Sequence, residues 1–165
     1  MEQTMPAGID GENGRPVMTE APGARLTHTF RAAPEQVFDA WTTPTLFATW
    51  WGGSAIEVPI DSVSLDARAG GTWTATMILG ENMPEFHWRG EYLEVERPSR
   101  LVLTMTDEPG AEREVLTAEF AAVDGGTELR FSQTGGNISP EDYVHAADGW
   151  RRAFEALEAL LRGAR

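Results

Sequence analysis

The chain has 165 residues, which fits a single domain of ordinary size with one hydrophobic core. It carries 26 acidic and 13 basic residues, all of the latter arginine, so its formal net charge is -13. This charge repels the phosphates of nucleic acids and anionic membrane surfaces, and the absence of cysteine excludes disulfides and thiolate metal sites. Since the sequence has neither a membrane-spanning apolar run nor a secretory signal, we expect a cytoplasmic protein.

The N-terminal region differs in composition from the rest of the chain. Residues 1–22 are rich in glycine and proline and hold few aliphatic side chains. Because this composition cannot offset the entropy lost on folding, a disordered tail is predicted over residues 1–22 and a folded domain over residues 23–165. Met18 is an alternative start of the native chain.

The first predicted elements are a strand and two short helices. Residues 26–30 alternate polar and apolar side chains, as a strand with one buried face does. Pro34 suits the first turn of a helix that continues to Trp41. Pro44 ends this helix and starts a second one, which runs to Trp50.

The middle of the chain has the pattern of six strands separated by short turns. Alternating side chains and turn residues predict strands at 57–65, 72–79, 86–95, 101–105, 112–123 and 129–133. Parallel neighbours need long crossover connections, so strands joined by short turns predict an antiparallel sheet.

The last segment is predicted to be one long helix. Ser139-Pro140-Glu141 is typical of a helix start, and a helix of about 24 residues, roughly 36 Å long, follows. Its apolar face consists of Tyr143, Ala147, Trp150, Phe154, Leu157 and Leu161. We expect this helix alone to cover the apolar face of a curled sheet and to leave a cleft beside it. The small residues expected to face that cleft are Ala75, Ala118, Ala147 and Gly149.

Several short motifs follow one another along the chain. The first runs from Phe30 to Pro44 and contains Ala33-Pro34-Glu35-Gln36-Val37-Phe38. The others are Trp50-Trp51-Gly52, Gly70-Gly71-Thr72-Trp73, the stretch from Gly90 to Val102, Asp124-Gly125-Gly126-Thr127 and Gly149-Trp150. Together they resemble START-related helix-grip (SRPBCC) proteins and, more narrowly, homologues of the C-terminal domain of the heat-shock protein 90 ATPase activator. The resemblance covers residues 25 to about 162. It implies an α+β fold in which a curved antiparallel sheet of six or seven strands wraps around a long C-terminal helix.

The predicted functional site is the cleft between the sheet and the last helix. Clefts of this kind are largely apolar and hold a few polar groups that orient the ligand, so the expected ligand is a small hydrophobic or aromatic molecule. The predicted ligand-binding residues are Trp51, Trp73, Ala75, Met77, Trp88, Tyr92, Met105, Ala118, Phe131, Gln133, Tyr143, Ala147, Trp150 and Phe154. Gln133 either orients a ligand or marks the point where its strand leaves the core, and Arg89 and Tyr92 are polar candidates at the cleft mouth.

Other kinds of site have weaker support in the sequence. The histidines His28, His87 and His145 fall on different elements without metal-ligand spacing, so no metal and no cofactor is predicted. His87 is expected to point outward, unless a bulge turns it inward as an acid or base. The carboxylates nearest to predicted inward positions are Glu57, Asp61, Glu94, Glu119 and Asp148, and no pair among them has a spacing that demands catalysis. The chain also lacks a nucleophile elbow and a phosphate-binding loop.

Three functions therefore stay open, in this order. The first is binding of a small hydrophobic ligand. The second is an enzyme, such as a cyclase or hydrolase acting on a polyketide-like compound in the same cleft. The third is an interaction protein like the chaperone activators, with the role in stress response that the resemblance implies. It ranks last because residues 1–22 are too short to supply the additional N-terminal domain of those activators. Neither nucleic acid nor membrane is an expected partner, and homodimer formation stays open.

Overall fold

The computed structural model describes residues 22–108, 110 and 112–163. Nearly all of the predicted tail, including the alternative start Met18, lies outside these residues. The strands are β1 (Gly23–Phe30), β2 (Ser64–Leu65), β3 (Thr72–Ile78), β4 (Glu85–Glu96), β5 (Arg100–Met105), β6 (Glu114–Val123) and β7 (Gly126–Thr134). The helices are α1 (Pro34–Thr42), α2 (Pro44–Trp50) and α3 (Pro140–Gly163), together with a 3₁₀ turn at Ile60–Ser62.

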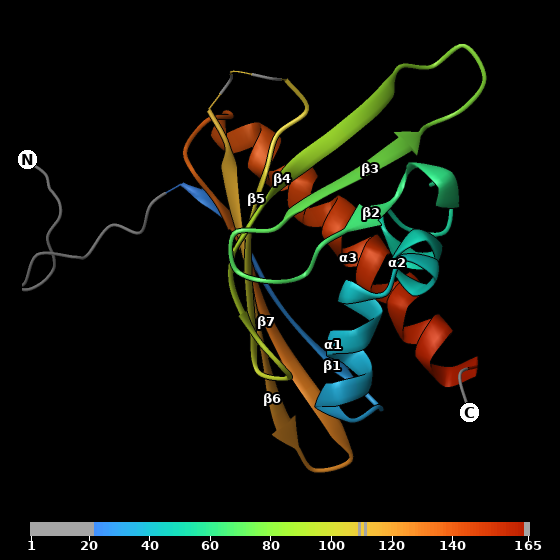
Figure 1. Ribbon diagram of the computed structural model, residues 1–165, viewed down its shortest axis with the longest axis vertical. Helices are drawn as coiled ribbons and strands as arrows, with labels where there is room; N and C mark the ends of the chain where they lie inside the picture. Colours follow the sequence, from blue (N-terminus) through green and yellow to red (C-terminus); the bar gives the residue numbers. More distant parts are fainter. Residues whose placement is uncertain (1–21, 109, 111, 164–165) are drawn as a thin grey trace, which may run out of the picture.

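The seven strands form one antiparallel sheet in the order β1-β7-β6-β5-β4-β3-β2. Strand β1 pairs with β7, so the start of the described chain lies beside the last strand. The sheet bends around the three helices, and α3 crosses it diagonally (Figure 1). This arrangement confirms the predicted α+β helix-grip fold. None of the described helices is long and apolar enough to span a membrane.

The prediction of a continuous strand over residues 57–65 is wrong. Only Glu57 and the two residues of β2 pair with β3, and the 3₁₀ turn lies between them. Pro59 has no N–H to donate to a sheet, whereas its carbonyl oxygen accepts a hydrogen bond from the Ser62 N–H at 2.9 Å. The proline therefore turns the chain away from the sheet edge.

The two short helices cover much of the concave face, so the prediction that α3 alone does so is wrong. Two rings of α1 pack against Phe120 of β6. The Phe38 centroid lies 5.7 Å from that of Phe120, and the Trp41 centroid lies 6.1 Å from it. Phe47 of α2 lies 6.2 Å from Trp73 of β3, also in ring contact. Aromatic side chains from these helices thus occupy space that the sequence pattern assigned to a cleft.

Helix α3 begins and packs as predicted. The Ser139 hydroxyl oxygen accepts a hydrogen bond from the Asp142 N–H at 3.0 Å, which caps the first turn. The buried residues of the helix are Tyr143, Trp150, Ala153, Phe154, Leu157 and Leu161. Near its C-terminal end, Glu158 lies 2.8 Å from His28 of β1 and fixes the helix against this edge strand.

Gly90 of β4 allows a close crossing inside the sheet. The indole N–H of Trp73 reaches across β4 and donates to the carbonyl oxygen of Thr104 on β5 at 2.8 Å. A Cβ at position 90 would lie 2.6 Å from the Trp73 indole nitrogen and would also overlap the Thr104 carbonyl oxygen. Only glycine leaves room for this hydrogen bond.

Candidate functional site

The predicted ligand-binding residues gather at the interface between the sheet and the helices. Eleven of the fourteen are buried, and Met77, Trp88 and Ala147 are half-buried. Those that belong to the hydrophobic core or pack against it are Trp51, Trp73, Ala75, Met77, Trp88, Tyr92, Met105, Ala118, Phe131, Trp150 and Phe154. On α3, Ala146 rather than Ala147 packs against this core.

Aromatic rings fill the centre of this interface. The Trp150 ring of α3 lies 4.4 Å from Phe131, 5.0 Å from Trp51 and 6.4 Å from Trp41, measured between ring centroids. The last of these contacts is stacked, with an interplanar angle of 11°. Burial of large rings in mutual contact is stabilising, so this cluster anchors α3 on the sheet.

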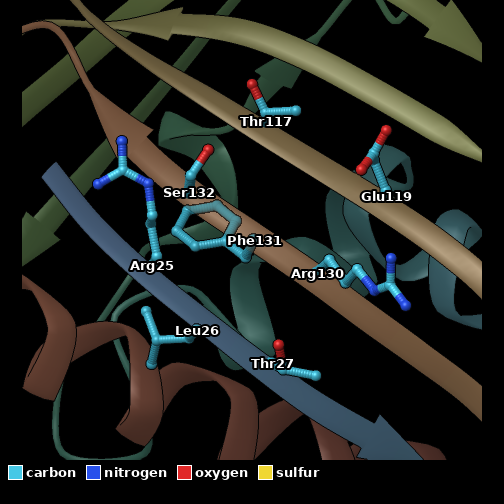
Figure 2. A pocket seen from close by; sticks show the side chains of 8 residues that line it. All are labelled: Arg25, Leu26, Thr27, Thr117, Glu119, Arg130, Phe131 and Ser132. Atoms are coloured by element: carbon cyan, nitrogen blue, oxygen red, sulfur yellow. The ribbon is translucent and has the colours of Figure 1, made fainter. Parts of the chain in front are cut away.

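Two shallow hollows in the described part of the chain lie away from that interface. One, of about 480 Å³, lies on β1, β7 and β6 and presents polar side chains such as Thr27, Thr117 and Ser132 (Figure 2). The other, of about 520 Å³, lies at the β3–β4 turn around Leu79 and Met83. The open void that the sequence predicted beside α3 is therefore occupied by rings, because α1 and α2 supply aromatic side chains.

The six indole N–H groups divide into two kinds. Those of Trp50, Trp73 and Trp150 donate to Ala40 O, Thr104 O and Gln133 Oε1 at 2.7 to 2.8 Å. Those of Trp41, Trp51 and Trp88 are buried and find no acceptor among the described residues. An unpaired buried N–H costs about 1–3 kcal/mol, so native proteins keep few of them. Trp41 and Trp51 both contact the Trp150 ring, whereas the printed ring contact of Trp88 is with Phe86 on the same strand.

Position 149 in the middle of α3 has room for a side chain. A Cβ at Gly149 would meet no atom within 4 Å. Gly149 shares a helix face with Arg152, three residues on, and Arg152 Cβ would lie 3.3 Å from a Cβ at Gly53. A Cβ at the preceding Gly52 would lie 3.2 Å from Met77 Cε, so this loop lies against both α3 and β3. We use the term inner site for Trp51, Met77, Trp88, Gly149 and Trp150.

A buried polar network borders the inner site. Gln133 Oε1 accepts the Trp150 indole N–H, and Gln133 Nε2 donates to Glu114 Oε1 at 3.1 Å. Glu114 Oε2 accepts from the backbone N–H and the Nδ2 group of Asn137, at 3.3 and 2.7 Å. Tyr143 completes the network through a hydrogen bond between its hydroxyl and Glu114. Burial and this hydrogen bond both raise the pKa of Tyr143 above its ordinary value. Gln133 is thus buried, and its strand does not leave the core there.

Glu114 and Asn137 were missed by the sequence reasoning. A signal for Glu114 was present, since it precedes Leu116 and Ala118 at the two-residue spacing of the inward face of β6. Asn137 had no such signal, because its role depends on the fold of the loop between β7 and α3. The five carboxylates considered instead are Glu57, Asp61, Glu94, Glu119 and Asp148, and all of them are exposed or half-buried.

The remaining polar candidates lie outside the inner site. His87 is exposed, and its Nδ1 lies 3.1 Å from the Thr76 hydroxyl, so the alternative in which it points inward is wrong. His28 contacts Glu158, and His145 is exposed. Within residues 22–108, 110 and 112–163, no three potential metal ligands lie together. Arg89 is exposed, whereas Tyr92 is buried. Burial raises the pKa of the Tyr92 hydroxyl, and the nearby charge of Asp66 adds to the effect.

The chain was compared with known proteins. Residues 31–162 match the family model described as Activator of Hsp90 ATPase homolog 1-like protein. A structure from Chromobacterium violaceum is 24% identical, covers 85% of this chain and 96% of its own, and superposes with a TM-score of 0.74. The AHSA1 protein from Silicibacter pomeroyi is 23% identical, with coverages of 85% and 97% and a TM-score of 0.74. A solution structure from Staphylococcus epidermidis is 22% identical, with coverages of 87% and 92% and a TM-score of 0.73.

The comparisons agree with the architecture described above. No curated protein matches the chain. At these identities the solved structures show the shared fold alone, and the family model adds membership because it spans the chain from the end of β1 to the end of α3. The chain therefore belongs to the family of Activator of Hsp90 ATPase homolog 1-like proteins.

Proposed function

We propose that this protein binds a small aromatic or apolar molecule that carries a hydrogen-bond acceptor, and that it does so at the inner site. The observation that carries the proposal is the indole N–H of Trp51, which is buried in a ring cluster without an acceptor. A ligand carbonyl or ether oxygen placed there would satisfy this donor, while its apolar part would stack on the surrounding rings.

The rim of the inner site allows entry. Met77 and Trp88 are half-buried, unlike the fully enclosed Trp51, so they move at lower cost than the deeper rings. The flexible methionine adapts its shape to a ligand. Trp88 stacks on Phe86 at 5.7 Å, and its own indole N–H is the second donor without an acceptor. A ligand that displaces Met77 and Trp88 would therefore reach two unpaired donors.

Ligand binding is favoured over the two alternative functions. An enzyme acting on a polyketide-like compound needs an acid or base that is free to move a proton. The buried carboxylate of Glu114 is already held by Gln133, Asn137 and Tyr143. The chaperone-activating role that the family description names would instead use a surface, and capture of a chaperone from native lysate would support that role.

The test compares two ligands of the same shape by isothermal titration calorimetry. 2-Acetylnaphthalene carries a carbonyl acceptor, and 2-ethylnaphthalene does not. We expect the ketone to bind the wild type more tightly, and Trp51→Phe to weaken its binding about 5- to 10-fold without changing that of the hydrocarbon. Gly149→Leu fills the space beside α3 and should weaken the binding of both.

Trp50→Phe is the matched control for this experiment. It also replaces a buried indole by a phenyl ring, but the Trp50 N–H already donates to the Ala40 carbonyl oxygen. The ratio of the two affinities should therefore stay as in the wild type. Failure of the wild type to bind either naphthalene up to its solubility limit would overturn the proposal.

A further inference from the structure

We propose that Glu114 gives the inner site a negative pole, so that the site accepts neutral and cationic aromatic molecules and excludes anionic ones such as carboxylates. The inference rests on the proposed function and specifies its ligand class. It follows from the charge state of Glu114, from the absence of a compensating cation inside the described fold, and from the position of Gln133.

The surroundings of Glu114 are those of an ionised carboxylate. Its side chain is enclosed, with the residue 6% exposed. Oε1 accepts a hydrogen bond from Gln133 Nε2, and Oε2 accepts two from Asn137. These three donors are N–H groups, and the Tyr143 hydroxyl is a further partner, so both oxygens are placed to act as acceptors, which is what a deprotonated carboxylate does. Glu114 is the one charged side chain among the buried residues of the described chain.

Arginine does not neutralise this charge from within. The chain has no lysine, and every arginine in the described part of the chain is exposed except Arg100, which is half-buried. Arg100 pairs with Glu94 and Glu119. The neighbouring Arg113 is exposed and pairs with Glu91. A buried charge surrounded by neutral donors keeps its long-range field, because little water screens it.

Gln133 directs this field toward the inner site. Because its Nε2 donates to Glu114, its Oε1 is turned the other way, where it accepts the Trp150 N–H at 2.7 Å. A ligand beside Trp150 is therefore close to the partial negative charge of Gln133 Oε1, and the full negative charge of Glu114 lies on the far side of Gln133. An anion would be repelled in a medium of low dielectric constant, whereas an ammonium group or a neutral ketone would not.

Three naphthalenes that differ in charge test the inference at neutral pH by calorimetry: 2-acetylnaphthalene, 2-naphthoate and 2-(aminomethyl)naphthalene. We expect wild type to bind naphthoate at least about 10-fold more weakly than the ketone, and the amine no more weakly than the ketone. The preference should persist in about 1 M salt, which screens surface charges but screens a buried one much less. In Glu114→Gln, an isosteric neutral variant, naphthoate binding should tighten about fivefold or more while ketone binding stays within about twofold.

Glu119→Gln is the matched control, since it lies on the same strand, removes the same charge and is exposed. It should leave all three affinities unchanged. Equal binding of naphthoate and ketone by the wild type in high salt overturns the inference and leaves the proposed function standing. A wild type that binds none of the three compounds overturns the proposed function and the inference together. Because the wild-type ranking is a complete test, the inference stays falsifiable even if Glu114→Gln does not fold.

Discussion

Single side chains decide how the aromatic interior of this protein is arranged. Trp73 is held by one hydrogen bond across β4, from its indole N–H to the Thr104 carbonyl oxygen. Trp150 is held in the same way by Gln133. Trp51 has no such bond, and its ring is positioned by packing against Phe47 at 4.5 Å and Trp73 at 5.4 Å. Trp73 and Trp150 are thus oriented by a hydrogen bond, and Trp51 by ring packing.

The first prediction concerns Gly90. Gly90→Ala should lower the free energy of unfolding by about 2–4 kcal/mol, because the new methyl group overlaps the Thr104 carbonyl oxygen and displaces the Trp73 indole. Urea denaturation followed by circular dichroism measures the effect. A loss below about 0.5 kcal/mol would show that β4 shifts to admit the methyl group at little cost.

At the scale of elements, the position of α3 depends on two separate contacts. Its middle is anchored by Trp150 in the ring cluster, and its C-terminal part by the Glu158 carboxylate on His28 of β1. Arg162, one turn later on α3, also pairs with Glu158. Gly149 lies close to the first anchor and interrupts an otherwise favourable helix sequence.

The second prediction is that Gly149→Ala stabilises the protein. Glycine within a helix costs roughly 0.5–1 kcal/mol relative to alanine, and a methyl group at this position meets no atom within 4 Å. The free energy of unfolding should rise by about that amount in the same urea assay. A decrease would mean that position 149 is more crowded than the structure shows.

The third prediction concerns pH and the contact between α3 and β1. The hydrogen bond from His28 lowers the pKa of Glu158 below its ordinary value of 4.5, and Arg162 adds to this effect. A lowered folded-state pKa means that the stabilisation is complete above pH 4.5 and is lost as the pH falls through the lowered value. Glu158→Gln should therefore cost about 1 kcal/mol at pH 7 and progressively less below pH 4.5.

Urea denaturation of both proteins between pH 7 and pH 3 measures this difference. Glu155→Gln, an exposed position on the same helix, is the control and should track the wild type at each pH. A cost for Glu158→Gln that is independent of pH would exclude the charge of Glu158 as its cause.

At the scale of the whole molecule, negative charge dominates. Acidic residues outnumber arginines by 26 to 13, so the charge of the chain is far from balanced. The pairs present in the described chain, such as Arg97 with Asp39, lie at the surface and contribute little individually. Self-repulsion of the remaining carboxylates therefore opposes the compact state.

The fourth prediction follows from this repulsion. Raising the ionic strength from about 0.01 M to about 0.15 M shortens the screening length from roughly 30 Å to roughly 8 Å. The melting temperature should rise by about 2–5 °C, because the repulsion weakens while the buried rings are unaffected. Calorimetry in sodium chloride measures the change, and a fall in melting temperature would show that surface ion pairs outweigh the repulsion.

Local sequence patterns predict most elements and their inward faces, and the segment 57–65 is the exception. The buried face of β3, β6 and β7 follows from alternation, and that of α3 from helical spacing. Both patterns involve residues close together in the sequence. The antiparallel sheet follows from the short turns. For the same reason Gln133 and the aromatic residues of the interface could be named as inward-facing before any coordinates.

The amount of space between sheet and helices depends on tertiary packing, which no local pattern predicts. Trp41 and Trp51 are brought into the concave face by two helices whose placement depends on the bend of the sheet, and no local pattern specifies that bend. The same holds for which indole N–H groups find an acceptor, since each acceptor lies on a different element. Glu114 and Asn137 meet only when the loop after β7 closes onto β6. Such contacts between distant segments are properties of the packed fold.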